Sequence, residues 1–393
     1  MVDVAKHEQG RSETVNPIKA LLNEGQAVWQ DDISRQMLQE GTLRARIEEV
    51  GIQGVTSNPT IFQKAIAAGD AYDEDIKRLL QEGQSPGEIF EALAVQDIQD
   101  ACDLFRPLYD RLDGEDGYVS IEVSPSLARD TQGTIKEARR LWKAVDRPNL
   151  MIKVPGTDEG APAVETLLSE GINVNITLLF SIANYERVAL AYISALQRRH
   201  DAGLPIDRMA SVASFFVSRV DTLVDKLLDA KLATASGGEK AKLEAIKGKV
   251  AVANAVLAYE KFEEIFGGSR FAQLRDNGAH VQRPLWASTG TKNSAYSDVL
   301  YVETLVGPHT VNTMPIATME AFLDHGTVER TVDRDYADAH RVMDDLASVG
   351  ISIDEVTAQL EEEGIASFAA SYDDLLEGVA AKRSALAEAV AAS

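Results

Sequence analysis

One lysine lies in an apolar segment and could act as a nucleophile. Lys153 occurs in NLMIKVPGT, with apolar residues at 150, 151, 152 and 154, so we expect its side chain to point inward from a buried strand. Burial disfavours the ammonium form and leaves neutral amine that can attack a carbonyl and form a Schiff base. A core lysine neutralised by a carboxylate is the alternative from this residue alone. The polar residues around Lys153 must therefore decide between the two.

Two carboxylates, Asp31 and Glu122, could supply the acid and base that imine chemistry needs. One group must handle the water that leaves the carbinolamine, and another the hydroxyl whose proton leaves as a carbon–carbon bond breaks. Two carboxylates in different environments can divide these tasks. Taken singly, each could instead be a salt-bridged carboxylate of the fold. The assignment depends on whether the elements that carry them bring them to Lys153.

The sequence predicts short strands that alternate with helices and could position these groups. Apolar residues recur at three- and four-residue spacing over 85–109 and 134–145, which is typical of helices. Eight βα units favour an α/β fold of the closed (β/α)8 type, the TIM barrel. An open doubly wound sheet is the competing fold, but it often carries a glycine-rich phosphate fingerprint, and no such sequence is found. The expected strands are 26–31, 54–58, 118–124, 150–155, 172–178, 209–215, 284–288 and 310–314.

Two helical segments lie outside this alternation. Residues 232–282 are too long for one crossover, and we expect them to form two helices inserted between strands six and seven. Residues 351–393 are expected to form a C-terminal helical tail. Neither segment has the features of an independent domain, so the sequence predicts a single domain over residues 1–393.

In a (β/α)8 barrel the carboxyl ends of the strands face the active site, so polar residues there are the candidates. Lys153 and both carboxylates occupy such positions. The barrel thus gathers one amine, two carboxylates and several hydroxyl and amide groups at one end. The full set of polar strand ends is Asp31, Asp32, Thr56, Ser57, Asn58, Glu122, Lys153, Asn175, Thr177, Ser214 and Ser288.

The sequence closely resembles the transaldolase family. GVTSNPTIFQKAI matches the family's first signature, built on a Thr-Ser/Thr-Asn-Pro core, and NLMIKVPGTDEG matches the second, around the Schiff-base lysine. The similarity continues through INVNITLLFS and SVASFFVSRVD. The total length of the chain and its insertion resemble those of the extended bacterial members. The resemblance implies transfer of a dihydroxyacetone unit from sedoheptulose 7-phosphate to glyceraldehyde 3-phosphate, giving erythrose 4-phosphate and fructose 6-phosphate in the pentose phosphate pathway.

The resemblance also implies a role for each candidate. Lys153 would form the imine, and Asp31 would act as acid and base on the C4 hydroxyl. Glu122 and Thr177 would hold the catalytic water. The substrate-binding residues that the resemblance implies for the dihydroxyacetone end are Thr56, Asn58, Asn175, Ser214 and Phe216.

The phosphate end is expected to use Arg219, Ser288 and Lys292. Arg219 in FFVSRVD matches the family's phosphate arginine, whose planar fork suits phosphate oxygens. Shorter members place a second arginine two residues after the serine, whereas this chain reads Ser288-Thr289-Gly290-Thr291-Lys292. The loop is longer, and Lys292 becomes the expected second cation, with a solvated loop lysine as its alternative.

Two alternatives to a transaldolase stay open at this point. A fructose-6-phosphate aldolase would cleave the sugar and release free dihydroxyacetone, and in those relatives an aromatic hydroxyl replaces the water-binding glutamate. Glu122 therefore favours transfer. A non-catalytic barrel retained for binding is the other possibility, since fold alone does not fix function.

Composition limits the partners. The formal net charge of −23 argues against broad nucleic-acid or anionic-membrane surfaces, so we expect sugar-phosphate substrates, no nucleic acid and no membrane. A single cysteine, no run long enough to span a bilayer and no apolar core in residues 1–17 predict a cytoplasmic protein. No metal-binding spacing is found, and no cofactor is expected, because the lysine itself supplies the electron sink. The sequence leaves the oligomeric state open.

Overall fold

A computed structural model describes residues 16–392 of the chain, with side chains described to residue 387. Eight parallel strands close into a barrel in the order β1 to β8, which confirms the predicted fold class. The predicted strands are all present, although β2 ends three residues before the predicted end at 58, and β5 begins and ends later than predicted. The strands are β1 (Gln26–Gln30), β2 (Gly54–Val55), β3 (Tyr118–Glu122), β4 (Leu150–Pro155), β5 (Val174–Leu179), β6 (Ser211–Phe216), β7 (Arg283–Ala287) and β8 (Thr310–Met314).

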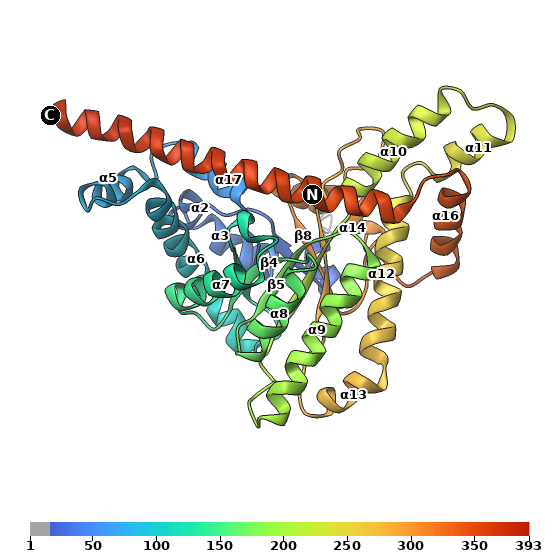
Figure 1. The fold of residues 1–393 in the computed structure, drawn as a ribbon, viewed down its shortest axis with the longest axis horizontal. Helices are drawn as coiled ribbons and strands as arrows, with labels where there is room; N and C mark the ends of the chain where they lie inside the picture. Colours follow the sequence, from blue (N-terminus) through green and yellow to red (C-terminus); the bar gives the residue numbers. More distant parts are fainter. Residues whose placement is uncertain (1–15, 393) are drawn as a thin grey trace, which may run out of the picture.

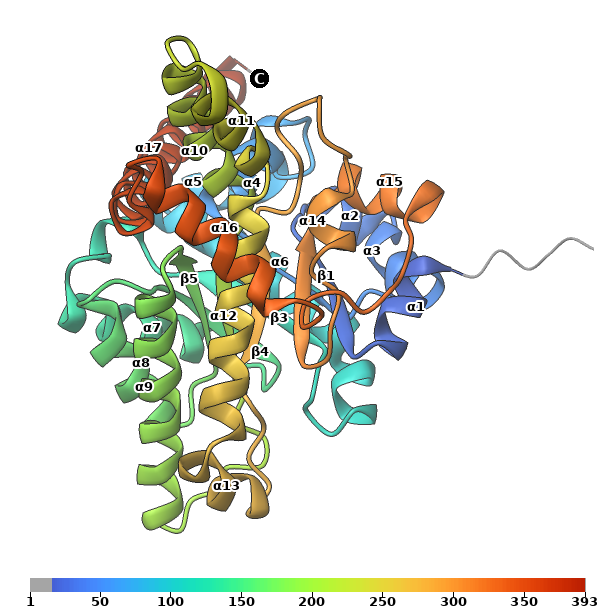
Figure 2. The ribbon, with the colours of Figure 1, turned by 90° about the vertical axis from the view of Figure 1, so that its right-hand side faces the viewer.

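Helices connect the strands and form the outer layer (Figures 1 and 2). Those before β6 are α1 (Pro17–Asn23), α2 (Arg35–Gln39), α3 (Thr42–Ala45), η1 (Arg46–Val50), α4 (Pro59–Ala67), α5 (Asp73–Gln81), α6 (Pro86–Arg111), η2 (Pro125–Leu127), α7 (Thr131–Val145), α8 (Gly160–Ser169) and α9 (Ile182–Asp201). Those after β6 are α10 (Ser218–Leu232), α11 (Gly237–Ile246), α12 (Val250–Gly267), α13 (Ser269–Asp276), α14 (Leu300–Glu303), α15 (Ile316–His325), α16 (Tyr336–Ser348) and α17 (Ile353–Ala392). None of the helices in residues 16–392 combines the length and apolarity that crossing a bilayer requires.

The register of three neighbouring strands sets the level of the candidate residues. Glu122 of β3 pairs with Lys153 of β4, and Lys153 pairs with Asn175 of β5. Paired residues on parallel strands point to the same face, so these three side chains project together into the barrel. The barrel itself therefore places a carboxylate, an amine and an amide side by side.

The opposite end of the barrel is closed by packing and a buried ion pair. Trp29 donates from its indole nitrogen to Asp116 at 2.8 Å, and Arg283 donates to the other oxygen of Asp116 at 2.7 Å. Gly54 allows this packing, because a Cβ there would lie 2.7 Å from both the Trp29 ring and the Tyr118 carbonyl oxygen. This end holds the strands in register and leaves the other end free for chemistry.

The insertion between β6 and β7 contains three helices, so the prediction of two over residues 232–282 was wrong. Helices α11, α12 and α13 follow α10 in this segment. The break between α11 and α12 lies at Gly248, whose φ of 70° is left-handed, and a Cβ there would lie 2.6 Å from the Tyr296 ring. Glycine is favoured at such a position, and it ends one helix before the next begins.

The predicted tail over 351–393 is one continuous helix, α17, of 40 residues; residue 393 lies outside the described residues. Figure 1 shows α17 running along one whole edge of the molecule, from α16 past α5, and Figure 2 shows it nearly end-on above the barrel. Its Phe368 shares a cavity with residues at the carboxyl ends of the strands. The helix therefore covers the end of the barrel where the candidate residues lie.

Candidate active site

The predicted residues gather around one cavity at the carboxyl ends of the strands. It has a volume of about 340 Å³, and its lining includes ten of the twelve residues to which the resemblance assigns a role. Glu122 and Asn175 are the two outside that lining, and both are next to Lys153 in the strand register. The strand-end residues Asp32 and Ser57 are also absent from the lining. The lining residues are Asp31, Thr56, Asn58, Thr60, Ile61, Lys64, Lys153, Thr177, Ser214, Phe216, Arg219, Ala287, Ser288, Gly290, Lys292, Thr313, Pro315 and Phe368.

Lys153 lines this cavity and is 5% exposed. Its Nζ is 3.2 Å from Glu122 Oε2 and donates a hydrogen bond to the Ser57 carbonyl oxygen at 3.1 Å. The ion pair of a core lysine is thus present. Lys153 nevertheless lines an open cavity, which a purely structural ion pair does not require.

Glu122 is a carboxylate with little hydrogen-bonding support. Burial raises the pKa of Glu122 and the charge of Asp31 adds to the effect, while nearby Lys153 opposes it. Apart from the ion pair with Lys153, its two oxygens have no hydrogen-bond partner among the described residues. A carboxyl group in this setting accepts a proton more readily than one in water, which suits an acid and base beside an amine.

Thr177, like Glu122, is a buried polar residue whose side chain lacks a hydrogen-bond partner among the described residues. Its hydroxyl makes no hydrogen bond within the described residues, although the side chain is fully buried and lines the cavity. The β5 register shifts between Ile176 and Leu179, and Leu178 has a left-handed φ of 60°. Such bulges re-aim side chains next to active sites, and here the bulge immediately follows Thr177.

Asp31 is held on the first strand by hydroxyl groups. Thr56 Oγ1 donates to Asp31 Oδ1 at 2.7 Å and lies 2.7 Å from Thr313 Oγ1, and the Asp31 backbone N–H bonds to Met314. Burial raises the pKa of Asp31, while Lys153, the Thr56 hydrogen bond and more distant cations lower it in part. The carboxyl group is therefore fixed in position and biased towards holding a proton.

The two asparagines are placed differently. Asn58 caps α4 by accepting from the Ile61 N–H at 3.0 Å, and it also lines the cavity. Asn175 is fully buried, donates to Ser120 Oγ at 3.0 Å and accepts from Ser214 Oγ at 2.7 Å. Ser214, not Asn175, is the member of this pair that lines the cavity.

Three cations besides Lys153 line the same cavity: Arg219, Lys292 and Lys64. Within the described residues none of the three makes a side-chain hydrogen bond or an ion pair. The Arg219 guanidinium carbon lies 5.2 Å from the Phe216 ring centroid and 5.9 Å from that of Phe368. Burial lowers the pKa of Arg219, but an arginine stays charged in proteins. In an acidic protein, these unpaired cations create a locally positive surface.

Ser288 stands beside these cations in a strained conformation. Its φ of 56° is left-handed, and its Oγ lies 3.0 Å from Ser218 Oγ at the start of α10. Non-glycine residues are rare in this region and occur where the surroundings hold them, frequently at functional sites. The loop after β7 therefore begins with a fixed turn.

Eight lining residues were not predicted from the sequence, and three of them, Thr313, Lys64 and Phe368, bear on the chemistry of the site. Thr313 at the end of β8 follows the strand-end rule and could have been found by it. Lys64 lies in α4, six residues after Asn58 in the first signature, and Phe368 lies in α17. Nothing in a helical pattern separates these two from an ordinary surface lysine and an ordinary apolar helix residue.

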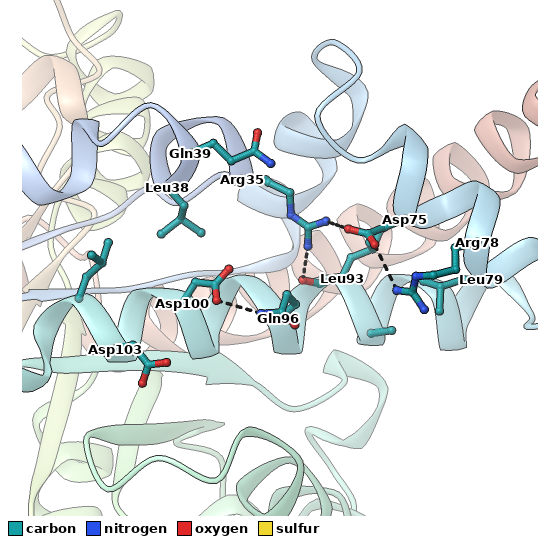
Figure 3. Close-up of a pocket in the computed structure, with 12 residues that line it drawn as sticks. Arg35, Leu38, Gln39, Asp75, Arg78, Leu79, Leu93, Gln96, Asp100 and Asp103 are labelled. Atoms are coloured by element: carbon teal, nitrogen blue, oxygen red, sulfur yellow. Dashed lines mark hydrogen bonds and ion pairs between the residues drawn. The ribbon is translucent and has the colours of Figure 1, made fainter.

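A second cavity of about 510 Å³ lies between α2, α5 and α6 (Figure 3) and shares no lining residue with the cavity of Lys153. Arg35 contacts Asp75 and pairs with buried Asp97 at 2.8 Å, and Asp75 also pairs with Arg78. Gln96 bonds to Asp100 in the same wall. The polar side chains of this second cavity are largely paired with one another by hydrogen bonds and ion pairs, in contrast to the unpaired groups around Lys153. Among the described residues, no cluster of three or more His, Cys, Asp or Glu side chains is arranged to hold a metal ion.

Fold and cavity together define a (β/α)8-barrel enzyme whose buried lysine contacts one carboxylate and shares a cavity with a second carboxylate and three further cations. Comparison with known proteins is consistent with this class. The chain matches the family described as Transaldolase/Fructose-6-phosphate aldolase over residues 28–379, and it belongs to that family.

The similarity to individual transaldolases extends over nearly the full length. A transaldolase of Trichodesmium erythraeum is 48% identical over 370 residues, which are 93% of this chain and 97% of the relative. One of Thermobifida fusca is 50% identical over 366 residues, covering 93% and 98%, and one of Acidothermus cellulolyticus is 49% identical over 365 residues, covering 93% and 96%. By homology the chain is a transaldolase of the longer bacterial type.

Proposed function

We propose that the enzyme transfers a dihydroxyacetone unit from sedoheptulose 7-phosphate to glyceraldehyde 3-phosphate through a Schiff base on Lys153. The observation that carries the proposal is the position of Lys153, whose amine contacts Glu122 and shares one cavity with Asp31. The products are erythrose 4-phosphate and fructose 6-phosphate. This reaction belongs to the pentose phosphate pathway.

Imine formation begins with attack of the neutral Lys153 amine on the C2 carbonyl. Glu122 accepts the proton of the ammonium, and the raised pKa of Glu122 supports this role. The carbinolamine then loses water, which Glu122 and Thr177 hold. Apart from the Lys153–Glu122 ion pair, their side-chain oxygens are buried without a hydrogen-bond partner in the described residues, which supports this role.

Carbon–carbon cleavage is assigned to Asp31. It removes the proton of the C4 hydroxyl, the C3–C4 bond breaks, and its electrons move into the imine to give an enamine on Lys153. Erythrose 4-phosphate leaves as the aldehyde. In the second half the enamine carbon attacks the aldehyde of glyceraldehyde 3-phosphate, and Asp31 returns the proton to the new hydroxyl. Hydrolysis of the imine releases fructose 6-phosphate and restores Lys153.

The hydroxyl groups of the bound unit are assigned to polar residues around Lys153. Asn58 uses its side-chain oxygen to cap α4, so its amide N–H groups are the donors available to substrate. Ser214 reaches the cavity and is anchored beneath by Asn175, while Thr56 holds Asp31 and lines the same wall. Phe216 supplies an apolar surface. In this arrangement Asn175 contributes in part by holding the Ser214 hydroxyl in position.

The phosphate is assigned to Arg219, Ser288 and Lys292, as the resemblance implies. Lys64 joins them because it lines the same cavity without an ion pair among the described residues. One phosphate with two negative charges would meet up to three cations, so the site can bind an anion despite the net charge of −23. The proposal needs no cofactor, and the enzyme is proposed to act in the cytoplasm, where a single buried cysteine stays reduced.

Borohydride reduction tests the proposal. Incubation with fructose 6-phosphate followed by reduction should fix a dihydroxyacetone adduct on the peptide that contains Lys153. Consumption of fructose 6-phosphate should depend on added erythrose 4-phosphate. An adduct on another lysine would contradict the site, whereas rapid acceptor-independent release of dihydroxyacetone would indicate an aldolase.

A further inference from the structure

Phe368 brings the C-terminal helix α17 into the cavity that contains Lys153. Its side chain is 5% exposed, and its ring centroid lies 5.6 Å from Lys153 Nζ and 5.9 Å from the Arg219 guanidinium carbon. Among the described residues that line the cavity, Phe368 is the one supplied by α17. An apolar ring from the far end of the chain thus forms a wall beside the reacting amine.

One face of α17 is fitted to this part of the barrel. Gly364, Phe368 and Ser371 are spaced by four and three residues, which places them on one side of a helix. A Cβ on Gly364 would lie 2.9 Å from Leu178 and 3.6 Å from an Arg219 nitrogen. Ser371 Oγ accepts a hydrogen bond of 2.8 Å from Thr60, which also lines the cavity.

Polar contacts hold α17 on both sides of Phe368. Before it, Glu361 accepts from Asn184 of α9 at 2.6 Å and pairs with Arg129 at 3.0 Å. After it, Lys382 donates to the Gly69 carbonyl oxygen at 2.7 Å. The helix is therefore fixed to the barrel at several points, and the Phe368 ring is held in place over the site.

A transferase with a covalent intermediate on Lys153 must protect that intermediate from water. After cleavage, the dihydroxyacetone unit stays on Lys153 until an aldehyde arrives, and water competes with that aldehyde. If the enamine carbon gains a proton, water can add to C2 of the iminium. The C–N bond then breaks, and free dihydroxyacetone leaves while the Lys153 amine is restored. Exclusion of water from this surface decides how often the unit is lost.

We propose that Phe368 is a positioning and shielding residue that favours transfer of the Lys153-bound unit to an aldehyde over its hydrolysis. The proposal rests on the proposed function, because it assumes the imine on Lys153. The apolar ring offers water no hydrogen-bond partner, and a water molecule at that surface loses interactions that it has in bulk solution. The wall thereby lowers the rate of hydrolysis without touching the reacting carbon–carbon bond.

The test compares release of dihydroxyacetone with transfer in three variants. Phe368→Ala removes the wall, and Phe368→Leu keeps part of its apolar volume. Leu375→Ala is the matched control, because Leu375 is equally buried on α17, two turns further on, and does not line the cavity. Each variant is incubated with fructose 6-phosphate, with and without saturating erythrose 4-phosphate, and both products are counted.

The ratio of dihydroxyacetone release to transfer should rise about tenfold in Phe368→Ala and less in Phe368→Leu. It should stay at the wild-type value in Leu375→Ala. A merely structural role would lower both rates together and leave the ratio unchanged. An unchanged ratio in a Phe368→Ala protein that still gives the Lys153 adduct would overturn the proposal.

Two further outcomes are informative. If Phe368→Ala does not fold, as judged by its melting temperature, Phe368→Leu carries the comparison, and a ratio equal to that of the wild type overturns the proposal. If the wild type gives no borohydride adduct on Lys153, the proposed function itself fails. The failure of the two ideas is therefore distinguishable.

Discussion

Removing the Arg219 guanidinium should weaken binding of phosphorylated substrates much more than binding of unphosphorylated ones. Arg219 is largely buried between the rings of Phe216 and Phe368 and makes no ion pair within the described residues. A net charge-assisted hydrogen bond to a partly buried phosphate is worth roughly 1.5 to 3 kcal/mol. Arg219→Ala should therefore raise KM for fructose 6-phosphate about ten- to hundredfold, and raise KM for unphosphorylated fructose little.

Steady-state kinetics with both donors measures this difference. Arg219→Lys is the control for charge alone, since it keeps a cation but loses the planar fork, and it should fall between wild type and Arg219→Ala. Lys292→Ala and Lys64→Ala then show which lysine completes the site. An equal rise in KM for both donors would refute the phosphate assignment and make Arg219 a packing residue. Loss of phosphate dependence in Lys64→Ala alone would move the second cation from the loop after β7 to α4.

The remaining predictions concern the reacting groups and one buried carboxyl. Lys153→Ala should abolish transfer and the borohydride adduct; an adduct that persists by mass mapping would exclude Lys153. Asp31→Ala should still form the adduct but cleave about 10² to 10⁴ times more slowly, whereas Glu122→Gln should also slow adduct formation; identical trapping kinetics in rapid-quench experiments would refute this division. Burial raises the pKa of Asp221 from 3.8 to about 6, so its protonated form stabilises the fold below pH 3.8 and this contribution is lost as the pH rises through 6. The loss amounts to about 3 kcal/mol, and denaturant unfolding of Asp221→Asn should lack that part of the pH dependence; equal pH slopes in wild type and variant would contradict it.

The strands and their polar ends could be predicted because the relevant signals are local. A buried strand shows as a short apolar run, and the polar residues near its carboxyl end are adjacent in sequence, as Lys153 is within β4 and Asp31 is directly after β1. The end of β2 was placed too late because Thr56, Ser57 and Asn58 continue an extended pattern, while the structure uses Asn58 to cap α4. A helix cap and a strand end compete for the same few residues.

The parts of the site that the sequence did not reveal depend on contacts between distant elements. Phe368 follows Lys153 by more than 200 residues, and an apolar position in a helix does not indicate which surface it will meet. Lys64 resembles any helical lysine until α4 is placed against the barrel. Asn175 and Ser214 illustrate a different limit: both were predicted as site residues, but the sequence does not indicate that Ser214 lines the cavity while its hydrogen-bond partner Asn175 does not.

The position of α17 after all eight strands affects the order in which the site is assembled during synthesis. Protein chains emerge from the ribosome with their N-terminal parts first, and all eight strands precede α17. The barrel can therefore close, with Lys153 already in it, before the helix that supplies Phe368 has left the ribosome. Under the proposed function, a nascent barrel in that state would present the Lys153 amine to carbonyl compounds without the Phe368 ring beside it.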